Sequence, residues 1–355
     1  MKKMLMAAAL AAVVTAAGAQ SNVSLYGIVD LGLVSEHGGA NGALTKLTSG
    51  IGSVSRFGLR GVEDLGGGLS AIFTLESGVK ADTGEQDSAG VLFQRQAWMG
   101  LRSTTWGTLT LGRQYTPFYK VFSDVADPFA TSYAGTARNL FPVSGATTRA
   151  SNTVKYATPN LRGWSAEAAY TFGEQAGSST AGRQTGFAAG YEQGPLVVRL
   201  GRLDRNSDVA GGAQHDSGSN TILAANYDFK IVKAYAAYER DKGYGVGTLA
   251  NTSNPYGGVA PTPSTDAREL LVGVTMPLGR GSLIASHIDK DDRSGYNQDA
   301  RQDAIGYVYP LSARTSVYTA YAKIHNKNGA GYTVGNNAEA GSGDSAVNLG
   351  LRHTF

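Results

Sequence analysis

The last nine residues constrain the fold of this chain more than any other feature. Residues 347–355 alternate apolar and polar side chains, and the run ends on the aromatic Phe355. In a membrane barrel, such a strand turns Val347, Leu349 and Leu351 toward lipid and its polar side chains toward a water-filled interior. The pattern therefore predicts a transmembrane β-strand, and its recurrence along the chain predicts that it is one of many.

The N-terminus has the composition of an export signal. Lys2 and Lys3 precede an apolar run over residues 4–17, and small residues follow at Ala17-Gly18-Ala19. This arrangement predicts a cleaved signal peptide over residues 1–19. A membrane-anchoring helix is the alternative, but the run is too short to span a bilayer and continues directly into a strand. Residues 20–355 are then expected to form one barrel domain.

The composition argues against several other classes of protein. The chain has no cysteine, which excludes disulfides and thiolate metal sites. Glycine is abundant, at 48 of 355 residues, and tyrosine is plentiful, as suits a large antiparallel barrel better than a soluble periplasmic protein. Loss of the two signal-peptide lysines reduces the formal net charge from +3 to about +1. This charge gives no reason to propose a nucleic-acid partner.

Sixteen candidate strands of about ten residues each can be found, beginning with Val23–Leu33. The links between them alternate in character. Short links such as Glu63–Gly68 are tight turns, whereas long polar links such as Ser35–Gly52 and Asn326–Asp344 lie between them. Long loops at one end and tight turns at the other are typical of outer-membrane barrels. The sequence therefore predicts an all-β, sixteen-stranded antiparallel transmembrane barrel.

One long connection differs from the others. The segment between Gly112 and Arg149 is rich in aromatic and apolar residues, unlike the Gly/Ser/Asn/Asp loops elsewhere. A structureless surface loop of this length would be unusual. Its apolar content indicates that it is packed, and the space available is the barrel lumen. We therefore expect this third long loop to fold inward.

Several short motifs resemble those of the general bacterial porins, in particular the sixteen-stranded trimeric branch of Gram-negative proteobacteria. In chain order, these motifs are Leu25-Tyr26-Gly27, residues 56–66 (RFGLRGVEDLG), residues 95–101 (RQAWMGL), residues 110–115 (TLGRQY), residues 152–156 (NTVKY) and the terminal Phe355. Each motif is weakly specific alone, but together they cover essentially the whole mature chain.

The resemblance implies a location and a function. It implies a homotrimer in the outer membrane, in contact with lipid and lipopolysaccharide, that forms a passive channel for small hydrophilic solutes and ions. It also implies that the terminal Phe355 is the signal recognised by the barrel insertion machinery. No cofactor and no enzymatic activity are expected for such a channel.

The resemblance further implies a pore constriction, where wall arginines face acids on an inward loop. By motif matching, the wall arginines are Arg56, Arg95 and Arg149, and the loop is roughly residues 115–148. The acids available on that loop are Asp124 and Asp127. A lysine that often follows the first-strand Tyr-Gly of the family is replaced here by Ile28.

Strand alternation supports these arginines unevenly. Arg56 shares a face with Gly58 and Arg60 and leaves Phe57 and Leu59 to lipid, which favours an inward Arg56. Arg149 shares a face with Thr153 and Lys155. Arg95 shares a face with three apolar residues, so its inward placement would turn Gln96 and Trp98 outward. Its assignment depends mainly on the resemblance.

Further residues could line the pore. The candidates are Arg60, Arg113, Tyr115, Tyr119, Lys120, Arg138 and Lys155. The two tyrosines could instead anchor the loop, and Arg113 could either pair with the loop carboxylates or lie at the periplasmic rim. Asp127, which precedes a proline, could simply begin a turn.

Basic residues outnumber acids in this set, so we expect a weak preference for anions. A substrate-specific channel for a sugar, phosphate or organic anion is the alternative. A barrel-embedded enzyme and a plugged, adhesive barrel are further alternatives. The five histidines are scattered without ligand spacing or a nucleophile partner, so the sequence predicts neither a catalytic nor a metal site.

Overall fold

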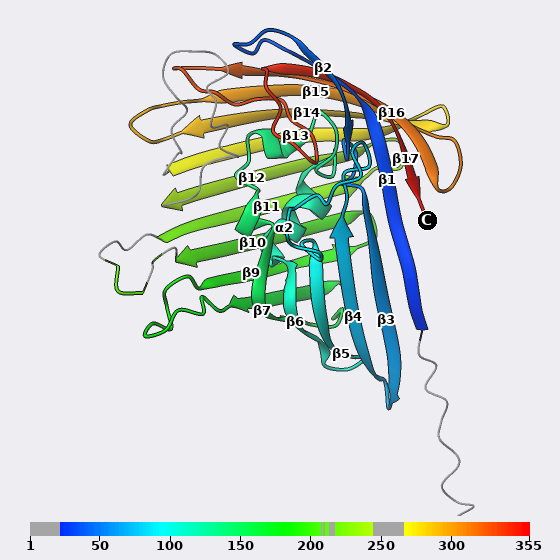
Figure 1. The fold of residues 1–355 in the computed structure, drawn as a ribbon, viewed down its shortest axis with the longest axis vertical. Coiled ribbons are helices and arrows are strands. Elements are labelled where there is room, and N and C mark those ends of the chain that lie inside the picture. The colour runs from blue at the N-terminus through cyan, green and yellow to red at the C-terminus, as the bar shows by residue number, and fades with distance from the viewer. Residues whose placement is uncertain (1–21, 207, 209, 213–216, 244–265) are drawn as a thin grey trace, which may run out of the picture.

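The structure is a computed structural model that describes residues 22–206, 208, 210–212, 217–243 and 266–355. The predicted signal peptide, residues 1–19, lies outside these residues. Seventeen antiparallel strands form one closed sheet (Figure 1). Within the described ranges, no helix combines the length and the apolar character needed to cross a membrane.

The strands are β1 Asn22–His37, β2 Leu44–Ser49, β3 Arg56–Gly66, β4 Leu69–Gly78, β5 Gln96–Ser103, β6 Gly107–Tyr115, β7 Arg149–Ala157, β8 Trp164–Thr171 and β9 Gln184–Gln193. They continue with β10 Leu196–Asn206, β11 Ser217–Asp228, β12 Lys233–Gly243, β13 Asp266–Leu278, β14 Gly281–Asp292, β15 Ala300–Pro310, β16 Thr315–Asn326 and β17 Ser345–Thr354. The short helical turns between β6 and β7 are α2 Pro117–Val121, η1 Phe122–Ala126, η2 Ala137–Asn139 and η3 Gly145–Thr147.

The predicted sixteen-stranded barrel is confirmed, because β2 and β3 share one place in the wall. Both pair with the same edge of β1: β2 with residues 31–36 and β3 with residues 22–28. The predicted long link Ser35–Gly52 was therefore too long. Part of that segment, β2, extends the wall by pairing with the upper end of β1.

The last strand shows the alternation on which the barrel prediction rests. Val347, Leu349 and Leu351 are 42–56% exposed on the outer face, whereas Asn348 is fully buried on the inner one. The same outer face continues around the sheet, with large exposed hydrophobic residues on nearly every strand. A continuous apolar surface of this extent is the face that a barrel turns toward lipid.

The two chain ends close the barrel. β17 pairs with β1 from Ile28 to His37, and Phe355 then exchanges backbone hydrogen bonds with Gly27, at 3.0 and 3.1 Å. The C-terminus accordingly lies beside β1 (Figure 1). A Cβ atom on Gly27 would lie 2.2 Å from the Phe355 ring and 2.6 Å from the carbonyl oxygen of Arg56. Glycine at position 27 thus leaves the space that the Phe355 ring occupies where β1 meets β17.

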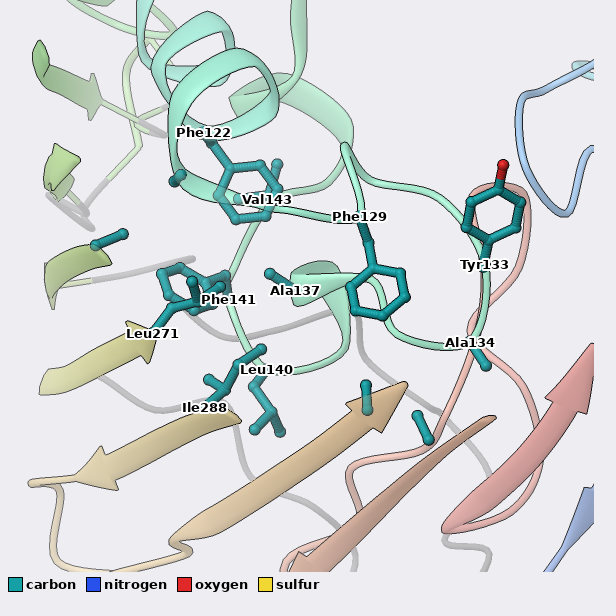
Figure 2. Packing of buried hydrophobic residues seen from close by; sticks show 14 of the residues in the cluster. Phe122, Phe129, Tyr133, Ala134, Ala137, Leu140, Phe141, Val143, Leu271 and Ile288 are labelled. Atoms are coloured by element: carbon teal, nitrogen blue, oxygen red, sulfur yellow. The ribbon is translucent and has the colours of Figure 1, made fainter. Parts of the chain in front are cut away.

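The segment between β6 and β7, residues 116–148, is called the inner loop below. Its Phe118, Phe122, Phe129 and Phe141 are almost completely buried and belong to one cluster with residues of the wall, and Figure 2 shows the last three of these phenylalanines. The wall residues of this cluster include Leu203, Ile222, Leu271 and Ile288. They lie on the face opposite the exposed Leu200, Leu223 and Leu270, so the loop packs against the lumen side of the wall.

Close packing of the inner loop depends on small residues in the wall. A Cβ atom on Gly273 of β13 would lie 2.7 Å from the ring of Pro128. Contacts this short do not occur between relaxed groups, so any larger residue at this position would move the loop away from the wall.

A segment between β2 and β3 that leaves the sheet binds the other side of the inner loop. Between β2 and β3, residues 50–55 leave the sheet, and the buried carboxylate of Asp30 accepts hydrogen bonds from the N–H groups of Gly52 and Ser53. Tyr318 donates a third, at 2.6 Å. The carbonyl oxygen of Ile51 then accepts a hydrogen bond from the N–H of Tyr133, at 2.8 Å. The loop is therefore held at both sides of the lumen.

The junction where β1 pairs with β17 gives a first testable prediction. Gly27→Ala should lower the free energy of unfolding by about 1–3 kcal/mol, because the added methyl group overpacks the closure of the barrel. The measurement is the temperature at which the folded band is lost on a detergent gel. Gly295→Ala is the matched control, since a Cβ there meets nothing within 4 Å. Equal transition temperatures for the two variants would contradict a role of Gly27 in closing the barrel.

Candidate functional site

A cavity of about 460 Å³ lies between the wall and the inner loop. Six basic and two acidic side chains line it, together with neutral residues such as Tyr115 and Asn337. The basic residues are Arg56, Arg95, Arg113, Lys120, Arg138 and Arg149, and the acids are Asp87 and Asp124. The structure thus brings the three predicted wall arginines together at one height of the barrel.

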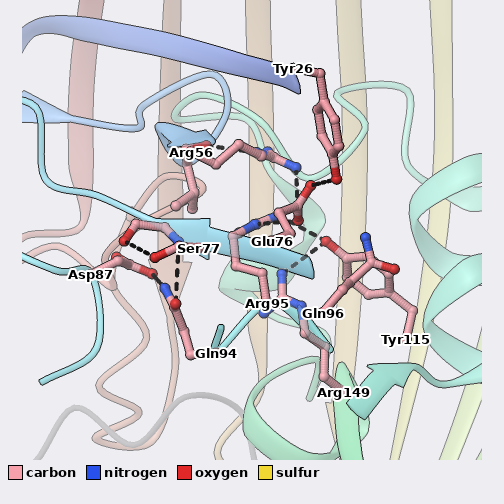
Figure 3. A network of polar contacts seen from close by, with 12 residues as sticks. Tyr26, Arg56, Glu76, Ser77, Asp87, Gln94, Arg95, Gln96, Tyr115 and Arg149 are labelled. Atoms are coloured by element: carbon pink, nitrogen blue, oxygen red, sulfur yellow. Dashed lines mark hydrogen bonds and ion pairs between the residues drawn. The ribbon is translucent and has the colours of Figure 1, made fainter. Parts of the chain in front are cut away.

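Glu76 of β4 joins two of these arginines (Figure 3). Nε of Arg95 donates to Oε1 of Glu76 at 2.8 Å, and an Nη atom of Arg56 lies 3.8 Å from the same oxygen. Tyr26 of β1 donates to the other carboxylate oxygen at 2.9 Å. Arg95 and Glu76 are each about 4% exposed, so both charges need this pairing to be tolerated away from water.

Tyr115, the last residue of β6, connects Arg95 to Arg149. Its hydroxyl oxygen accepts hydrogen bonds from Nη2 of Arg95 at 2.8 Å and from Nη2 of Arg149 at 3.0 Å. The guanidinium of Arg149 also lies over the Tyr115 ring, 4.6 Å from its centroid. The ring of Tyr119 stacks on the ring of Tyr115, with centroids 5.1 Å apart. A phenol that accepts two charged donors fixes both arginines without neutralising either.

The local charge balance is positive. Glu76 compensates one of the three arginines, and Arg149 donates to the phenol oxygen of Tyr115 rather than to a carboxylate. Guanidinium groups stay charged at every physiological pH. Low-dielectric walls concentrate the field of such groups, so a few fixed charges at a narrow place act strongly on a passing ion.

The alternation argument for Arg95 was wrong. Gln96 and Trp98 do not point outward, since both line an inner cavity beside Lys155 and Glu167. Arg95 precedes the first residue of β5, where the backbone is irregular, so strand alternation does not determine its direction. Alternation is also interrupted near Arg149, because the β6–β7 ladder shifts between Gly112 and Gln114.

The two loop acids lie in different surroundings. Asp124 is about half exposed, lines the cavity and pairs with Lys120 at 2.5 Å. Asp127 is 3% exposed and does not line the cavity. Its carboxylate accepts hydrogen bonds from the N–H groups of Phe129, Thr131 and Ala137. Asp127 therefore differs from the expected pore-facing acid: it shapes the loop from within.

Burial raises the pKa of Asp127 to about 6, while the three N–H donors act in the opposite direction. Burial likewise lowers the pKa of the Arg138 guanidinium. Arg138 is held by two carbonyl oxygens, donating to Val143 at 3.2 Å and to Asn337 at 2.6 Å. It joins the inner loop to the loop between β16 and β17.

Of the remaining candidates, Arg113 lines the cavity, whereas Lys155 and Arg60 do not. Arg113 lines the cavity, as expected for a pore-lining residue, and it donates to the Gln94 carbonyl oxygen and to Ser151 rather than to a loop carboxylate. Lys155 pairs with Glu167 at 3.6 Å, outside the main cavity. Arg60 lies over the ring of Tyr26, 5.3 Å from its centroid, and does not line the cavity either.

Sequence reasoning missed Glu76, Asp87 and Asn337. Glu76 could have been found, because it shares the inward face of β4 with Thr74, opposite the outward Leu75. Asp87 and Asn337 lie in irregular loops, where no periodic signal exists. The sequence also predicted no metal site, yet the buried acids Glu239, Asp241 and Glu269 lie close together in the described structure.

Comparisons with known proteins agree on one family. A family model described as Gram-negative porin matches residues 7–329. An outer membrane porin protein of Bordetella pertussis is 32% identical, and outer membrane porin protein 32 of Delftia acidovorans is 33% identical, each over the full length of both chains.

Solved structures agree with the sequence relatives. The anion-selective porin from Comamonas acidovorans superposes with a TM-score of 0.76 at 28% identity, covering 95% of this chain and 100% of that one. Salmonella typhi OmpF, at 16% identity and a TM-score of 0.70, shares the fold.

The role of Tyr115 makes a second prediction. Tyr115→Phe removes the oxygen that accepts hydrogen bonds from two guanidinium groups, so it should lower the free energy of unfolding by about 1.5–3 kcal/mol. Tyr119→Phe is the matched control, because no hydrogen bond of the Tyr119 hydroxyl is found in the part of the chain that the structure describes. Thermal unfolding in detergent measures both, and equal losses would show that the hydroxyl of Tyr115 has no special role.

Proposed function

The chain belongs to the Gram-negative porin family, and from this premise we propose that its inner-loop cavity is the constriction of a weakly anion-selective channel. As a member of that family, the protein forms a passive outer-membrane channel for small hydrophilic solutes and ions. One observation carries the proposal: six basic and only two acidic side chains line the cavity.

Arg56, Arg95 and Arg149 form the basic wall in this proposal. Rings of fixed cationic groups attract anions and exclude cations of the same size. The related porin from Comamonas acidovorans, which is described as anion-selective, supports the direction of this preference. The preference is weak, since Glu76 pairs with two of the arginines and Asp124 faces the same cavity.

Arg149 has the largest expected influence on solutes. Within the described residues no carboxylate pairs with it, and its guanidinium contacts the hydroxyl and the ring of Tyr115. Lys120 and Arg113 extend the basic surface, and Asp124 forms its acidic counterpart on the loop. Asp127 is not part of the proposed pore lining, because it is buried.

The remaining features of the protein follow the same proposal. We propose removal of residues 1–19 on export, assembly as a homotrimer, contact with lipopolysaccharide, and recognition of Phe355 by the insertion machinery. The trimer is supported by one solved structure with the same fold, the in-vitro folded OmpT of Vibrio cholerae, which is described as a trimer form. The chain belongs to a channel-forming family, and we propose that it has no catalytic activity.

Selectivity makes a third prediction. Arg149→Gln should lower the anion-to-cation permeability ratio several-fold, because one charge about 4 Å from an ion in water contributes about 1 kcal/mol. The reversal potential in a salt gradient across a planar bilayer measures the ratio. This substitution leaves Glu76 paired with Arg56 and Arg95, so the barrel should fold normally.

Arg60→Gln is the matched control for this experiment. It removes the same charge from the inner face of β3, but from a position outside the cavity. Its permeability ratio should stay near that of the unaltered protein. A cation-preferring unaltered channel, or equal effects of the two substitutions, would contradict the proposed constriction. Saturable block by one solute would favour a substrate-specific channel.

Assembly makes a fourth prediction. A homotrimer of independent pores should close in three equal current steps after a single insertion event. Single-channel recording at high voltage measures these steps. Uniform closure in one step from freshly inserted protein would contradict three separate pores.

A further inference from the structure

A second charged cluster lies in the barrel wall behind the inner loop. It consists of Asn220 of β11, Glu239 and Asp241 of β12, Glu269 of β13 and Lys290 of β14. The strand register places them side by side: Asn220 opposite Asp241, Glu239 opposite Glu269, and Glu269 opposite Lys290. Four of the five side chains are fully buried, and Lys290 is 2% exposed.

The cluster contains more negative charge than its ion pairs balance. Lys290 pairs with Glu269, and it also donates to the carbonyl oxygen of Leu140 in the inner loop at 3.0 Å. Within the described part of the chain, Lys290 is the one cation that forms an ion pair with these acids. With all three carboxyl groups ionised, one ammonium group leaves two negative charges uncompensated. Burying unpaired charge is very unfavourable unless another group balances it.

Several buried oxygen atoms also lack hydrogen-bond partners. Among the described residues, these include both carboxylate oxygens of Glu239, one oxygen each of Asp241 and Glu269, and Oδ1 of Asn220. Asn220 is an independent observation, because it carries no charge and comes from another strand. Its Nδ2 donates to Asp241 at 2.6 Å, which holds the unpaired amide oxygen beside the acids. Buried polar atoms without partners indicate that something else satisfies them.

The spacing of these oxygens suits a metal ion. One carboxylate oxygen from each of Glu239, Asp241 and Glu269 lies within 4.8 Å of the others. Calcium binds oxygen ligands at about 2.3–2.6 Å, so two ligands on opposite sides of one ion are separated by about this distance. Carboxylate and amide oxygens are the ligands of hard divalent cations, and the cluster has neither the histidine nor the cysteine that softer metals prefer.

We propose that Glu239, Asp241 and Glu269, with Oδ1 of Asn220, bind one divalent cation of the calcium class in the wall behind the inner loop. The ion balances the two uncompensated charges and gives the orphaned oxygens a partner. It leaves Lys290 free to hold the Leu140 carbonyl oxygen, so the ion stabilises the wall on which the inner loop packs. Protons shared between the carboxyl groups are the competing explanation.

The test measures bound calcium and thermal unfolding of the purified full-length protein after chelation and readdition of calcium chloride. The unaltered protein should retain about one calcium ion per chain more than Glu239→Gln does. Its unfolding temperature should rise with calcium, as for any ligand that binds only the folded state. Glu239→Gln should lose both the ion and the calcium-dependent rise.

Glu85→Gln is the matched control. Glu85 is an exposed acid that pairs with Lys80, and both residues lie in the loop between β4 and β5, away from the cluster. Lipopolysaccharide carries calcium of its own, and it remains equally attached to this variant. Glu85→Gln should therefore behave as the unaltered protein. Equal calcium content in Glu239→Gln and Glu85→Gln would overturn the proposal in favour of shared protons. An unfolding temperature of the unaltered protein that does not change with calcium would do the same.

A second variant covers the case in which Glu239→Gln does not fold. Asn220→Ala removes one proposed ligand and leaves every carboxylate in place. It should weaken calcium binding by about tenfold or more, measured by calorimetric titration. If a folded Asn220→Ala barrel bound calcium with unchanged affinity, Asn220 would not be a ligand. The proposed ligand set would then be wrong.

Discussion

The structure depends on the closure of one hydrogen-bonded sheet. Inside a lipid bilayer no water is available to backbone N–H and C=O groups, so a sheet can cross it only when it has no free edge. Here β1 pairs with β17 on one side and with β2 and β3 on the other, and the backbone of Phe355 completes the ladder at Gly27. The closed wall then provides a fixed inner surface. The phenylalanines of the inner loop pack against it, and the position of the loop determines where the arginines meet the lumen.

The inner loop separates two charged regions of opposite sign. On one side, guanidinium groups from β3, β7 and the end of the loop before β5 line an open cavity with little compensating charge. On the other side, the acids Glu239, Asp241 and Glu269 are buried in the wall. Lys290 joins this second region to the loop through the Leu140 carbonyl oxygen. A solute in the cavity therefore meets the basic groups directly, whereas the acids act mainly on the packing of the wall and the loop. Their separation allows an excess of positive charge at the pore in a chain of nearly neutral overall charge.

The candidate site was only partly predictable. Matching of short motifs indicated Arg56, Arg95 and Arg149, and the structure places all three beside one cavity. Strand alternation failed for Arg95, because that residue precedes β5 and its direction is set by Glu76 and Tyr115. Asp127 could not be distinguished from Asp124 by sequence, since only folding of the loop shows which carboxylate accepts backbone N–H groups and which one faces water.

The sequence by itself determined the barrel. A period of two residues indicates which side chains of a regular strand face lipid, and the segments between alternating short and long links predict sixteen places in the wall. Only the tertiary structure decided which charges become neighbours. Glu76 meets Arg95, and Glu239 meets Glu269, through strand register and loop packing between residues far apart in the chain. Alternation assigns a residue to the inside of the barrel but not to a height along it, and the electrostatics of a pore depend on that height.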